Sequence, residues 1–556
     1  MSPLSAPREF HGSFRSDELA RAVYSEAAGV AREWPRAVAV PLTTQAVVTL
    51  VRWANATQQP LIARGSGTSM AGGAVGDGVI VDLSRLRDCA DIAPLSGARL
   101  RGLAAAATHS VIVGPGVLRG EVDDAARTLG LRFPVDPSSG AYCTVGGMAA
   151  TNAAGPHSLS RGPMRDWVVG LECVFADATR AWIRRGAPLP DLPAVQRLVA
   201  WGAEHGERAD RRSTLAVRKD SSGYAIGAWR ASGELVDLLV GSEGTMALFT
   251  AIEVALEPRP TASATMLAAF ASLDQAAAAA LAASGAGAAT CELLDRTLLD
   301  LARGGARAVP VPDGTDAVLL SAIEGDDAFV ADVGIRRLRA TFEAHGATEV
   351  TLGATPDDEH ALWEWRHAAS PMLAALDPSI ASVQVIEDGC VPPPQLAAYV
   401  RGVREALIRQ RLRGVIFGHA GDAHMHVNPL VDVRDGDWRA RLEALVVEVA
   451  ALTARLGGTL AGEHGDGRLR APLNTAVRGA DAMTAWAGIK RAADPESLLN
   501  PGVIVPVEAQ QALGKIKYDP ALPPLPAAAR DALDEVRRTR GYAQPRLELV
   551  DAHSAR

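Results

Sequence analysis

The chain has 556 residues, which is too long for one ordinary hydrophobic core, so two or three domains are expected. Hydrophobic residues make up 48% of the sequence and charged residues 22%, as in soluble globular proteins. The net charge of −8 gives no general attraction to nucleic acid or to anionic membranes, and we expect no nucleic-acid partner.

The amino terminus does not resemble a secretory signal, because residues 1–33 carry charges throughout. No later run of about eighteen apolar residues predicts a membrane-spanning helix. The five cysteines are scattered, odd in number and never spaced as CxxC, which argues against a disulfide framework and against a cluster ligated by the chain. We therefore expect a cytoplasmic protein, and a peripheral position at the inner membrane is left open.

The first quarter of the chain alternates expected strands and helices. A helix with Thr44 as its N-cap is expected to bury one apolar face, formed by Val47, Leu50, Val51 and Ala54. Strands are expected at residues 60–63, 78–83 and 110–113, and a helix at residues 118–129. This alternation with glycine-rich connections indicates a nucleotide-binding domain of the α+β or α/β class.

Residues 64–73 form a loop between two expected strands and read RGSGTSMAGG. Its unobstructed amides and its hydroxyls suit a pyrophosphate, although such a composition is also typical of a simple turn. The spacing fits neither the GxGxxG nor the GxxxxGK[ST] phosphate motif. A nucleotide site here would therefore be of another kind.

Residues 134–162 are rich in small side chains, and such backbone suits close contact with a large flat ligand. The sequence EPRP at 257–260 marks a domain boundary, because its prolines and charges interrupt regular structure. Beyond it, an alanine-rich helix at 273–283 and further strands and helices indicate a second α+β domain up to about residue 455. The proline-containing tail from about residue 507 is expected to pack on the surface.

Two polar clusters occur in the last third of the chain. Residues 419–428 read HAGDAHMHVN, and residues 462–467 read GEHGDG. Alternate side chains of an extended strand share a face, so one side is expected to carry Asp422, His424, His426 and Asn428. Imidazoles, carboxylates and an amide suit a metal and a general base. The alternatives are a polar surface strand and a turn with exposed side chains.

Six motifs occur in one order between Tyr24 and Gly502. They are RGSGTS at 64–69, GG at 146–147 with the small residues up to 155, VGSEGT at 240–245, GHAGD at 418–422, GEHG at 462–465 and NPG at 500–502. In this set the chain resembles the FAD-linked D-2-hydroxy acid dehydrogenases, which include D-lactate dehydrogenase, the flavin subunit of glycolate oxidase and D-2-hydroxyglutarate dehydrogenase. The resemblance implies the α+β class, with a two-subdomain FAD-binding domain of the vanillyl-alcohol-oxidase type and an α+β cap domain.

The resemblance implies four segments. Residues 1–258 would form the FAD-binding domain and residues 259–455 the cap over the substrate. Residues 456–506 would return to the FAD-binding domain, and residues 507–556 would be a C-terminal extension. FAD would be bound noncovalently through Arg64, Gly65, Ser66, Gly67, Thr68, Ser69, Pro134, Ser138, Gly147, Thr151, Asn152, Gly155, Gly162 and Ile252.

The resemblance also implies a metal and a base at the reaction centre. His419, His426 and Glu463 would bind a divalent metal, zinc or manganese, and His464 would be the base. The implied reaction oxidises a D-2-hydroxy acid, D-lactate-like or glycolate-like, to the 2-oxo acid, with hydride transfer to flavin N5. Such a reaction needs a base for the hydroxyl proton, and a cation beside the hydroxyl lowers its barrier.

Three polar residues would position the substrate and the flavin. Arg366 would clamp the substrate carboxylate, since a guanidinium binds a carboxylate bidentately. Asn428 and Asn500 would orient substrate and flavin. The chain has five asparagines, and only four of its 56 basic residues are lysines, as expected of a GC-rich genome. An asparagine that persists against this bias is more informative than usual; Asn152 and Asn500 lie inside the six motifs, and Asn428 lies in the polar cluster at 419–428.

The chain departs from the family at two places. Relatives usually have Gly-Asn-Leu-His where this chain has AHMH at 423–426, so His424 is an extra ligand, a substrate contact or a tolerated replacement; we favour the last two. Relatives selective for a substrate with a second carboxylate often carry a lysine shortly before the motif that reads DGCVP here. This chain has no lysine there, which puts dicarboxylate specificity in doubt. Cys143 lies near the position where some related oxidases attach flavin, and we interpret it as a spectator thiol.

The partners expected are a small 2-hydroxy acid substrate and an external electron acceptor. A quinone, a cytochrome or an electron-transfer protein would serve as acceptor, because no cysteines are placed to hold a cluster. A homodimer is left open. Two other functions remain as alternatives, a flavin-dependent transferase of the alkyl-dihydroxyacetone-phosphate synthase type and a non-catalytic flavoprotein subunit.

Overall fold

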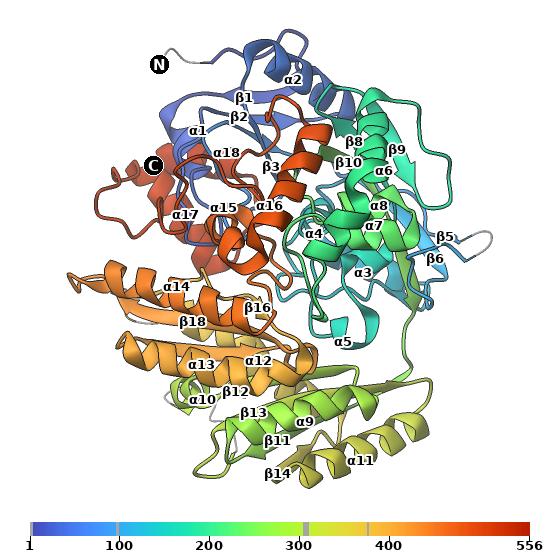
Figure 1. The fold of residues 1–556 in the computed structure, drawn as a ribbon, viewed down its shortest axis with the longest axis vertical. Helices are drawn as coiled ribbons and strands as arrows, with labels where there is room; N and C mark the ends of the chain where they lie inside the picture. The colour runs from blue at the N-terminus through green and yellow to red at the C-terminus, as the bar shows by residue number, and fades with distance from the viewer. Residues whose placement is uncertain (1–3, 96–98, 304–310, 375–376, 378, 556) are drawn as a thin grey trace.

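Three β-sheets organise the chain, and helices cover their faces (Figure 1). The computed structural model describes residues 4–95, 99–303, 311–374, 377 and 379–555. Within these ranges no helix is both long enough and apolar enough to cross a membrane. The α+β class expected from the sequence is confirmed.

The first sheet and its two early helices comprise β1 (Gly12–Arg15), α1 (Glu18–Val23), β2 (Ala37–Pro41), α2 (Thr44–Thr57), β3 (Leu61–Arg64) and β4 (Val79–Asp82). The strand order is β1-β2-β4-β3, antiparallel between β1 and β2 and parallel elsewhere. Alternate residues of β2 point to opposite faces. Ala37 and Ala39 pack in the core that contains α2, and Val38 packs on the face that α1 covers.

The predicted helix after residue 44 is confirmed as α2, which buries the expected face. Its N-cap is Thr43 and not Thr44, because the Thr43 hydroxyl accepts the Ala46 N–H at 3.1 Å. The predicted strands at 60–63 and 78–83 are confirmed as β3 and β4.

The second sheet is antiparallel, with the order β5-β6-β10-β8-β9 and β7 also pairing with β10. Its strands are β5 (Ala93–Pro94), β6 (His109–Val113), β7 (Leu131–Arg132), β8 (Val168–Phe175), β9 (Arg180–Arg184) and β10 (Ala247–Pro258). The connections contain α3 (Arg119–Arg127), α4 (Val145–Thr151), α5 (Ser158–Arg161), η1 (Met164–Trp167), α6 (Pro193–Ser213), α7 (Ile226–Ser232) and α8 (Leu235–Leu239). The strand expected at 110–113 and the helix expected at 118–129 are confirmed as β6 and α3.

The third sheet is antiparallel, with the order β14-β11-β13-β12-β17-β18-β15 and β16 also pairing with β18. Its strands are β11 (Ala262–Phe270), β12 (Thr290–Asp295), β13 (Ala317–Gly325), β14 (Ala347–Leu352), β15 (Ile380–Ser382), β16 (Gly389–Cys390), β17 (Arg413–Gly418) and β18 (His424–Asp432). The connections contain α9 (Leu273–Gly285), α10 (Arg296–Arg303), α11 (Ala328–Ala344), α12 (Pro356–Ala374), η2 (Pro393–Gln395), α13 (Leu396–Arg409) and η3 (Ala420–Asp422), and α14 (Trp438–Arg455) follows β18. The predicted alanine-rich helix is confirmed as α9.

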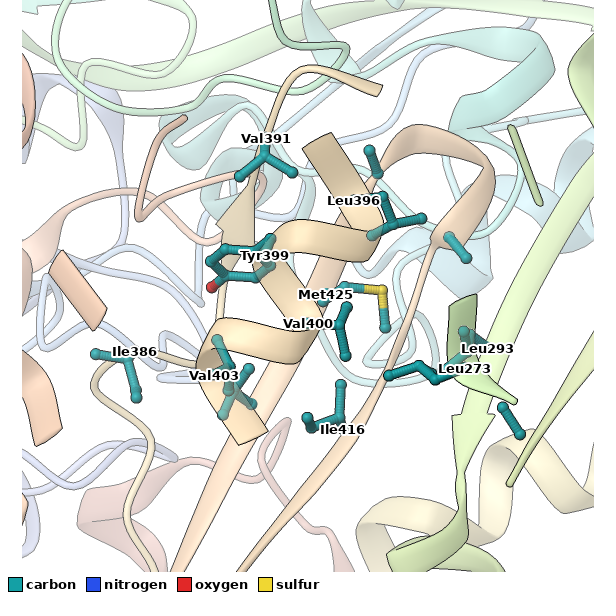
Figure 2. Packing of buried hydrophobic residues seen from close by; sticks show 14 of the residues in the cluster. Leu273, Leu293, Ile386, Val391, Leu396, Tyr399, Val400, Val403, Ile416 and Met425 are labelled. Carbon is teal, nitrogen blue, oxygen red and sulfur yellow. The ribbon is translucent and has the colours of Figure 1, made fainter. Parts of the chain in front are cut away.

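Both faces of the third sheet are buried. In β11, Ala268 and Phe270 join the core on one face, whereas Leu267 and Ala269 join the core on the other. Figure 2 shows the first of these cores, where side chains of α13 pack onto strand residues such as Ile416. The buried faces make this sheet a rigid support for the residues at its strand ends.

After α14 the chain returns to the first two sheets through α15 (Gly467–Arg470), η4 (Ala471–Leu473) and α16 (Asn474–Ala493). The carbonyl of Leu498 accepts the Leu61 N–H, and the Leu61 carbonyl accepts the Asn500 N–H, both at 2.8 Å. The tail then forms α17 (Ala527–Thr539) and α18 (Arg546–Ser554), which pack beside α1 (Figure 1). Their apolar residues share one core with Val38 and Ile62, so the tail covers a whole face of the first sheet.

Charged residues join the third sheet to the second. Glu324 on β13 accepts hydrogen bonds from Arg132 at 2.7 Å and from Arg161 at 3.2 Å, and His157 Nε2 lies 3.2 Å from it. Burial opposes the charged form of His157, but Asp136 and Glu324 outweigh it and raise the histidine pKa to about 10. Burial likewise opposes ionisation of Glu324, yet Arg132 and His157 hold its pKa below the usual range.

We predict that Glu324→Gln lowers the thermal unfolding midpoint, because Arg132, Arg161 and His157 each lose one of their two carboxylate partners. Breaking a buried pair costs about 3–5 kcal/mol, and about 2 kcal/mol is expected for these partly exposed groups. The raised His157 pKa contributes stability below the unfolded value of 6.5 that is lost as pH rises towards 10. The lowered Glu324 pKa contributes stability above 4.5 that is lost as pH falls. The difference in unfolding midpoint between the variant and the parent should therefore be largest between pH 4.5 and pH 6.5.

Thermal unfolding followed by circular dichroism between pH 4 and 10 measures this difference. Glu343→Gln is the matched control, since Glu343 pairs with Arg339 at 2.7 Å on an exposed helix surface. Equal shifts for the two variants, or a difference independent of pH, would contradict the prediction.

Candidate active site

A cavity of about 940 Å³ lies where segments from all three sheets meet. One part is formed by the loop at 64–69 and by small residues of the 137–151 region. The other part is formed by polar residues of the third-sheet region and of the returning segment, which are Arg366, Glu387, His426, Asn428, Glu463 and His464. Two regions that lie about 300 residues apart in sequence therefore share one space, whose volume suits a large cofactor.

Nine of the residues expected to contact FAD line this cavity: Arg64, Gly65, Ser66, Gly67, Thr68, Ser69, Ser138, Gly147 and Thr151. The hydroxyls of Ser66 and Ser69 are buried and have no hydrogen-bond partner among the described residues. Within the same described ranges, nothing accepts a hydrogen bond from the amides of residues 65–69. Buried donors are rarely left unpaired, so this loop fits an anionic group such as a pyrophosphate.

The other expected cofactor residues, Pro134, Asn152, Gly155, Gly162 and Ile252, are not among the described residues that line the cavity. Local packing accounts for several of them. A Cβ on Gly155 would lie 2.3 Å from the Asp136 carbonyl oxygen, and Gly162 has a φ of 74°. The Asn152 side chain accepts the Arg165 N–H at 2.9 Å, and Ile252 is fully buried in the second-sheet core. Their contact with FAD stays a prediction.

The polar strand expected over 422–428 begins later than predicted. Asp422 lies in η3, Ala423 has a φ of 56°, and β18 starts at His424. The expectation that Asp422 shares a strand face with the histidines is therefore wrong, because the left-handed turn ends the alternation before it. His424 and His426 do lie together, with ring centroids 4.8 Å apart.

Each of the three buried histidines has one ring nitrogen held by an acceptor. His419 Nδ1 lies 2.6 Å from Glu292 Oε1, and His424 Nε2 lies 2.8 Å from Asp388 Oδ1. His426 Nδ1 lies 2.9 Å from the Glu387 carbonyl oxygen. Such contacts fix ring orientation and tautomer, as they do for histidines that bind metals.

The remaining ring nitrogens converge on the Glu463 carboxylate. His419 Nε2 lies 3.2 Å from it, His426 Nε2 lies 3.5 Å from it and His424 Nδ1 lies 3.9 Å from it. One possible ligand atom from each of these four residues lies within 4.8 Å of the others. His424 Nδ1 is buried and has no described hydrogen-bond partner. The arrangement fits a divalent cation, and it favours the extra-ligand role for His424 over the two roles that we preferred from the sequence.

The protonation states agree with this donor set. Burial lowers the pKa of His424 to about 3, so its ring is neutral, as a metal ligand must be. Burial opposes ionisation of Glu463, but Lys219 and His419 outweigh it and hold its pKa well below the usual range. The Lys219 ammonium donates to Glu463 Oε2 at 2.8 Å. Glu463 is therefore an anion in the interior, compensated by a lysine and by imidazoles.

His464 lies at the cavity wall, beside this cluster. Its Nδ1 lies 2.9 Å from Glu387 Oε2, and its Nε2 lies 3.6 Å from Glu463 Oε1. Burial disfavours the imidazolium, but Glu387 and Asp388 outweigh it and raise the His464 pKa to about 10. A cation at the neighbouring cluster would oppose this rise and favour the neutral ring that a base requires.

The other three expected positions differ in their surroundings. Arg366 lines the cavity and donates through Nε to Glu292 Oε2 at 2.7 Å. Asn428 lines the cavity with a buried Oδ1 that has no described partner. The Asn500 amide donates to the carbonyls of Gly73 and Glu243 at 3.0 and 2.8 Å. Asn500 therefore ties together two loops that border the cavity, and its contact with substrate or flavin stays a prediction.

Sequence reasoning missed several charged residues of this site. Glu292, Glu387, Asp388 and Arg470 are buried and hydrogen-bonded to the residues above. Asp388 begins the DGCVP motif but was given no role from the sequence, and no spacing in the sequence marks the other three. Lys219 did carry a signal. It is one of only four lysines, so the composition bias that drew attention to asparagines applied to it equally.

Two family models match the chain, "FAD binding domain" at residues 35–184 and "FAD linked oxidases, C-terminal domain" at residues 259–504. The chain is 30% identical to glycolate oxidase subunit GlcD of Bacillus subtilis over 517 residues, which cover 91% of this chain and 96% of that protein. The chain belongs to the FAD-linked oxidase family. The resemblance inferred from the six motifs is thereby confirmed.

Other relatives of this FAD-linked oxidase differ in substrate. The chain is 28% identical to D-lactate dehydrogenase of Archaeoglobus fulgidus, over 84% of this chain and 91% of that protein. It is 27% identical to D-2-hydroxyglutarate dehydrogenase of Escherichia coli, over 86% of this chain and 49% of that protein. Among solved structures, 4-ethylphenol oxidase from Gulosibacter chungangensis matches with a TM-score of 0.63 and 17% identity, covering 88% of this chain and 94% of the other. This likeness confirms the expected vanillyl-alcohol-oxidase-type fold.

We predict that Glu292→Gln weakens divalent-metal binding by about 10- to 100-fold, the usual effect of removing an acceptor behind a metal-binding histidine. The variant keeps the size of the side chain but removes the charge that faces His419 Nδ1. Metal content after dialysis against graded chelator measures the change. Glu172→Gln is the control, because Glu172 is equally buried but bonds Thr250 and Arg180 away from the cluster. Equal metal retention in both variants would contradict the prediction.

Proposed function

We propose that this FAD-linked oxidase converts a small D-2-hydroxy acid to the 2-oxo acid. One observation carries the proposal: a single cavity joins the unpaired donors of the 64–69 loop to a histidine held by a carboxylate, a guanidinium and a cluster of imidazoles. Each part matches a need of the reaction, namely cofactor binding, proton removal, carboxylate binding and stabilisation of the developing alkoxide.

The unpaired donors of the 64–69 loop would hold FAD, which would supply the hydride acceptor for the substrate C2. Cys143 also lines the cavity, where burial raises the pKa of its thiol to about 11. A thiol that stays protonated near neutral pH is a poor nucleophile. This supports noncovalent binding of FAD.

His464 would take the hydroxyl proton at Nε2. Its Nδ1 faces Glu387, which holds the tautomer with a free Nε2 and stabilises the imidazolium that forms. Arg366 would pair with the substrate carboxylate through its terminal amino groups, since its Nε is used by Glu292. Asn428 would accept a hydrogen bond from the substrate at Oδ1, which is buried and has no described partner. These contacts fix C2 relative to the base.

The histidine cluster fits a resident divalent cation. His419, His426 and Glu463, with His424 as a fourth ligand, would hold zinc or manganese, which would lower the pKa of a substrate hydroxyl beside it. His419 and His424 lie behind the cavity wall, whereas His426 and Glu463 reach its surface. The cluster therefore borders the cavity through His426 and Glu463.

A monocarboxylate of the lactate or glycolate type fits the charges best. Arg366 is a cavity cation suited to one carboxylate, while Glu387 on the same wall is an anion engaged by His464 and Arg470. The relatives named as glycolate oxidase and D-lactate dehydrogenase agree with this choice. Electrons would pass to an external quinone, cytochrome or electron-transfer protein, because the chain has no cysteines spaced for a cluster.

Anaerobic mixing with a panel of D- and L-2-hydroxy acids tests the proposed reaction. The purified protein is expected to be yellow, to release FAD on denaturation, and to bleach at about 450 nm with glycolate or D-lactate. L-Lactate and D-2-hydroxyglutarate should bleach it more slowly. Colourless protein that cannot be reconstituted, or a flavin that no hydroxy acid reduces, would contradict the proposal and favour the transferase or non-catalytic alternatives.

Variants at the cavity separate the proposed roles. His464→Ala should retain FAD and metal yet slow flavin reduction by about two to four orders of magnitude, as expected for a lost general base. His426→Ala should lose metal, and a chelator should reproduce its effect in the parent protein. Arg366→Lys should mainly raise the KM, because it keeps the charge but loses the bidentate geometry. If chelation leaves turnover unchanged while His426→Ala abolishes it, the histidines bind substrate directly.

A further inference from the structure

The last thirty residues of the chain reach the cavity. The family model for the C-terminal domain ends at residue 504, so these residues lie outside it. Helices α17 and α18 are anchored on the first sheet, and the turn between them projects towards the 64–69 loop. Five residues of α17 and of this turn line the cavity: Asp534, Arg537, Arg538, Arg540 and Tyr542.

Direct contacts connect this turn to the expected cofactor loops. The rings of Tyr542 and Tyr142 lie 5.5 Å apart at an interplanar angle of 30°. Arg546 lies with its guanidinium carbon 5.6 Å from the Tyr542 ring and donates to the Ser66 carbonyl at 3.4 Å. Arg546 is only 4% exposed, and its Nε has no described partner. The segment is therefore held in a defined position beside Ser66, whose own hydroxyl is unpaired.

Positive charge exceeds negative charge at this end of the cavity. Arg537 is paired with Glu26 and lies 3.5 Å from Asp534, which also lines the cavity, but no described carboxylate lies within ion-pair distance of Arg538, Arg540 or Arg546. The buried Arg64 also has no such carboxylate among the described residues. Burial, together with Arg537 and other arginines, lowers the pKa of the neighbouring Lys517 to about 7. An uncompensated cluster of this kind is a site for a polyvalent anion.

We propose that residues 537–546 form part of the FAD site and bind its adenosine diphosphate half. Arg538 and Arg540 face the diphosphate from the side opposite the 64–69 loop, and the Tyr142–Tyr542 pair covers the adenosine. This proposal rests on FAD being the cofactor. Residues 537–546, which would form this wall of the site, lie outside both family models.

The charge at Arg540 can be removed without disturbing its backbone. Arg540 ends α17 with a φ of 56°, a conformation that asparagine adopts readily. Arg411 lies two residues after the end of α13 and has a similar backbone conformation, with a φ of 52°; it is exposed and does not line the cavity. Arg411→Asn is therefore a matched control for Arg540→Asn.

Titration of full-length deflavinated protein with FAD and with FMN, followed by flavin fluorescence, tests the proposal. Arg538→Gln/Arg540→Asn should weaken FAD binding by about tenfold or more, the effect of losing charge-assisted hydrogen bonds to phosphate. FMN lacks the adenosine monophosphate part, so its weaker binding should change by less than about twofold. Arg411→Asn should alter neither affinity. Tyr542→Leu should weaken FAD selectively, and Tyr542→Phe should not.

Unchanged FAD affinity in both the double variant and Tyr542→Leu would overturn the inference. Equal weakening of FAD and FMN would also overturn it, because the segment would then act on the fold of the whole site. An increased KM for the hydroxy acid at unchanged FAD affinity would assign the arginines to substrate capture instead. Failure of the parent protein to bind FAD is a separate result, which removes the proposed function itself.

Discussion

Five carboxylates are buried close to one another in this protein, and the rest of the site depends on how their charge is compensated. Glu292, Glu387, Asp388, Asp422 and Glu463 are all less than 10% exposed. An isolated carboxylate in such a place would take up a proton and become neutral, or the fold would be strongly destabilised. The compensating groups come from distant segments: Lys219 precedes β10, Arg366 lies on α12 and Arg470 ends α15. Compensating the charge of these carboxylates therefore requires the segments that carry Lys219, Arg366 and Arg470 to assemble.

Two of these carboxylates each connect an arginine to a histidine of the site. Glu292 bonds Arg366 through one oxygen and His419 through the other. Glu387 bonds Arg470 and His464 in a similar way. A ligand that attracts Arg366 would thus alter the charge that His419 experiences through Glu292, and a cation among the histidines would alter the proton affinity of His464. Binding of substrate and binding of metal are expected to be coupled for this electrostatic reason.

The sequence predicted the local elements better than it predicted the contacts between them. Helix α2, strand β4 and helix α9 follow from apolar periodicity and small-residue composition, which are local properties. The start of β18 was predicted two residues too early, because a left-handed residue at Ala423 is not visible in an alternating polar pattern. His419, His426 and Glu463 were recognised through motifs, yet their supporting acids Glu292 and Asp388 lie 127 and 75 residues away from the residues they hold. Contacts at such separations leave no periodic trace in one sequence.

The first sheet is made early in synthesis but completed only at the end. Its β3 edge pairs with residues 498–500, and the face that carries Val38 and Ile62 is covered by helices beyond residue 526. While the chain emerges from the ribosome, this sheet exposes one apolar face and one unpaired edge until almost the whole protein has been made. Its nascent form is therefore a surface that chaperones would bind, and a fragment that stops near residue 258 would keep that surface permanently.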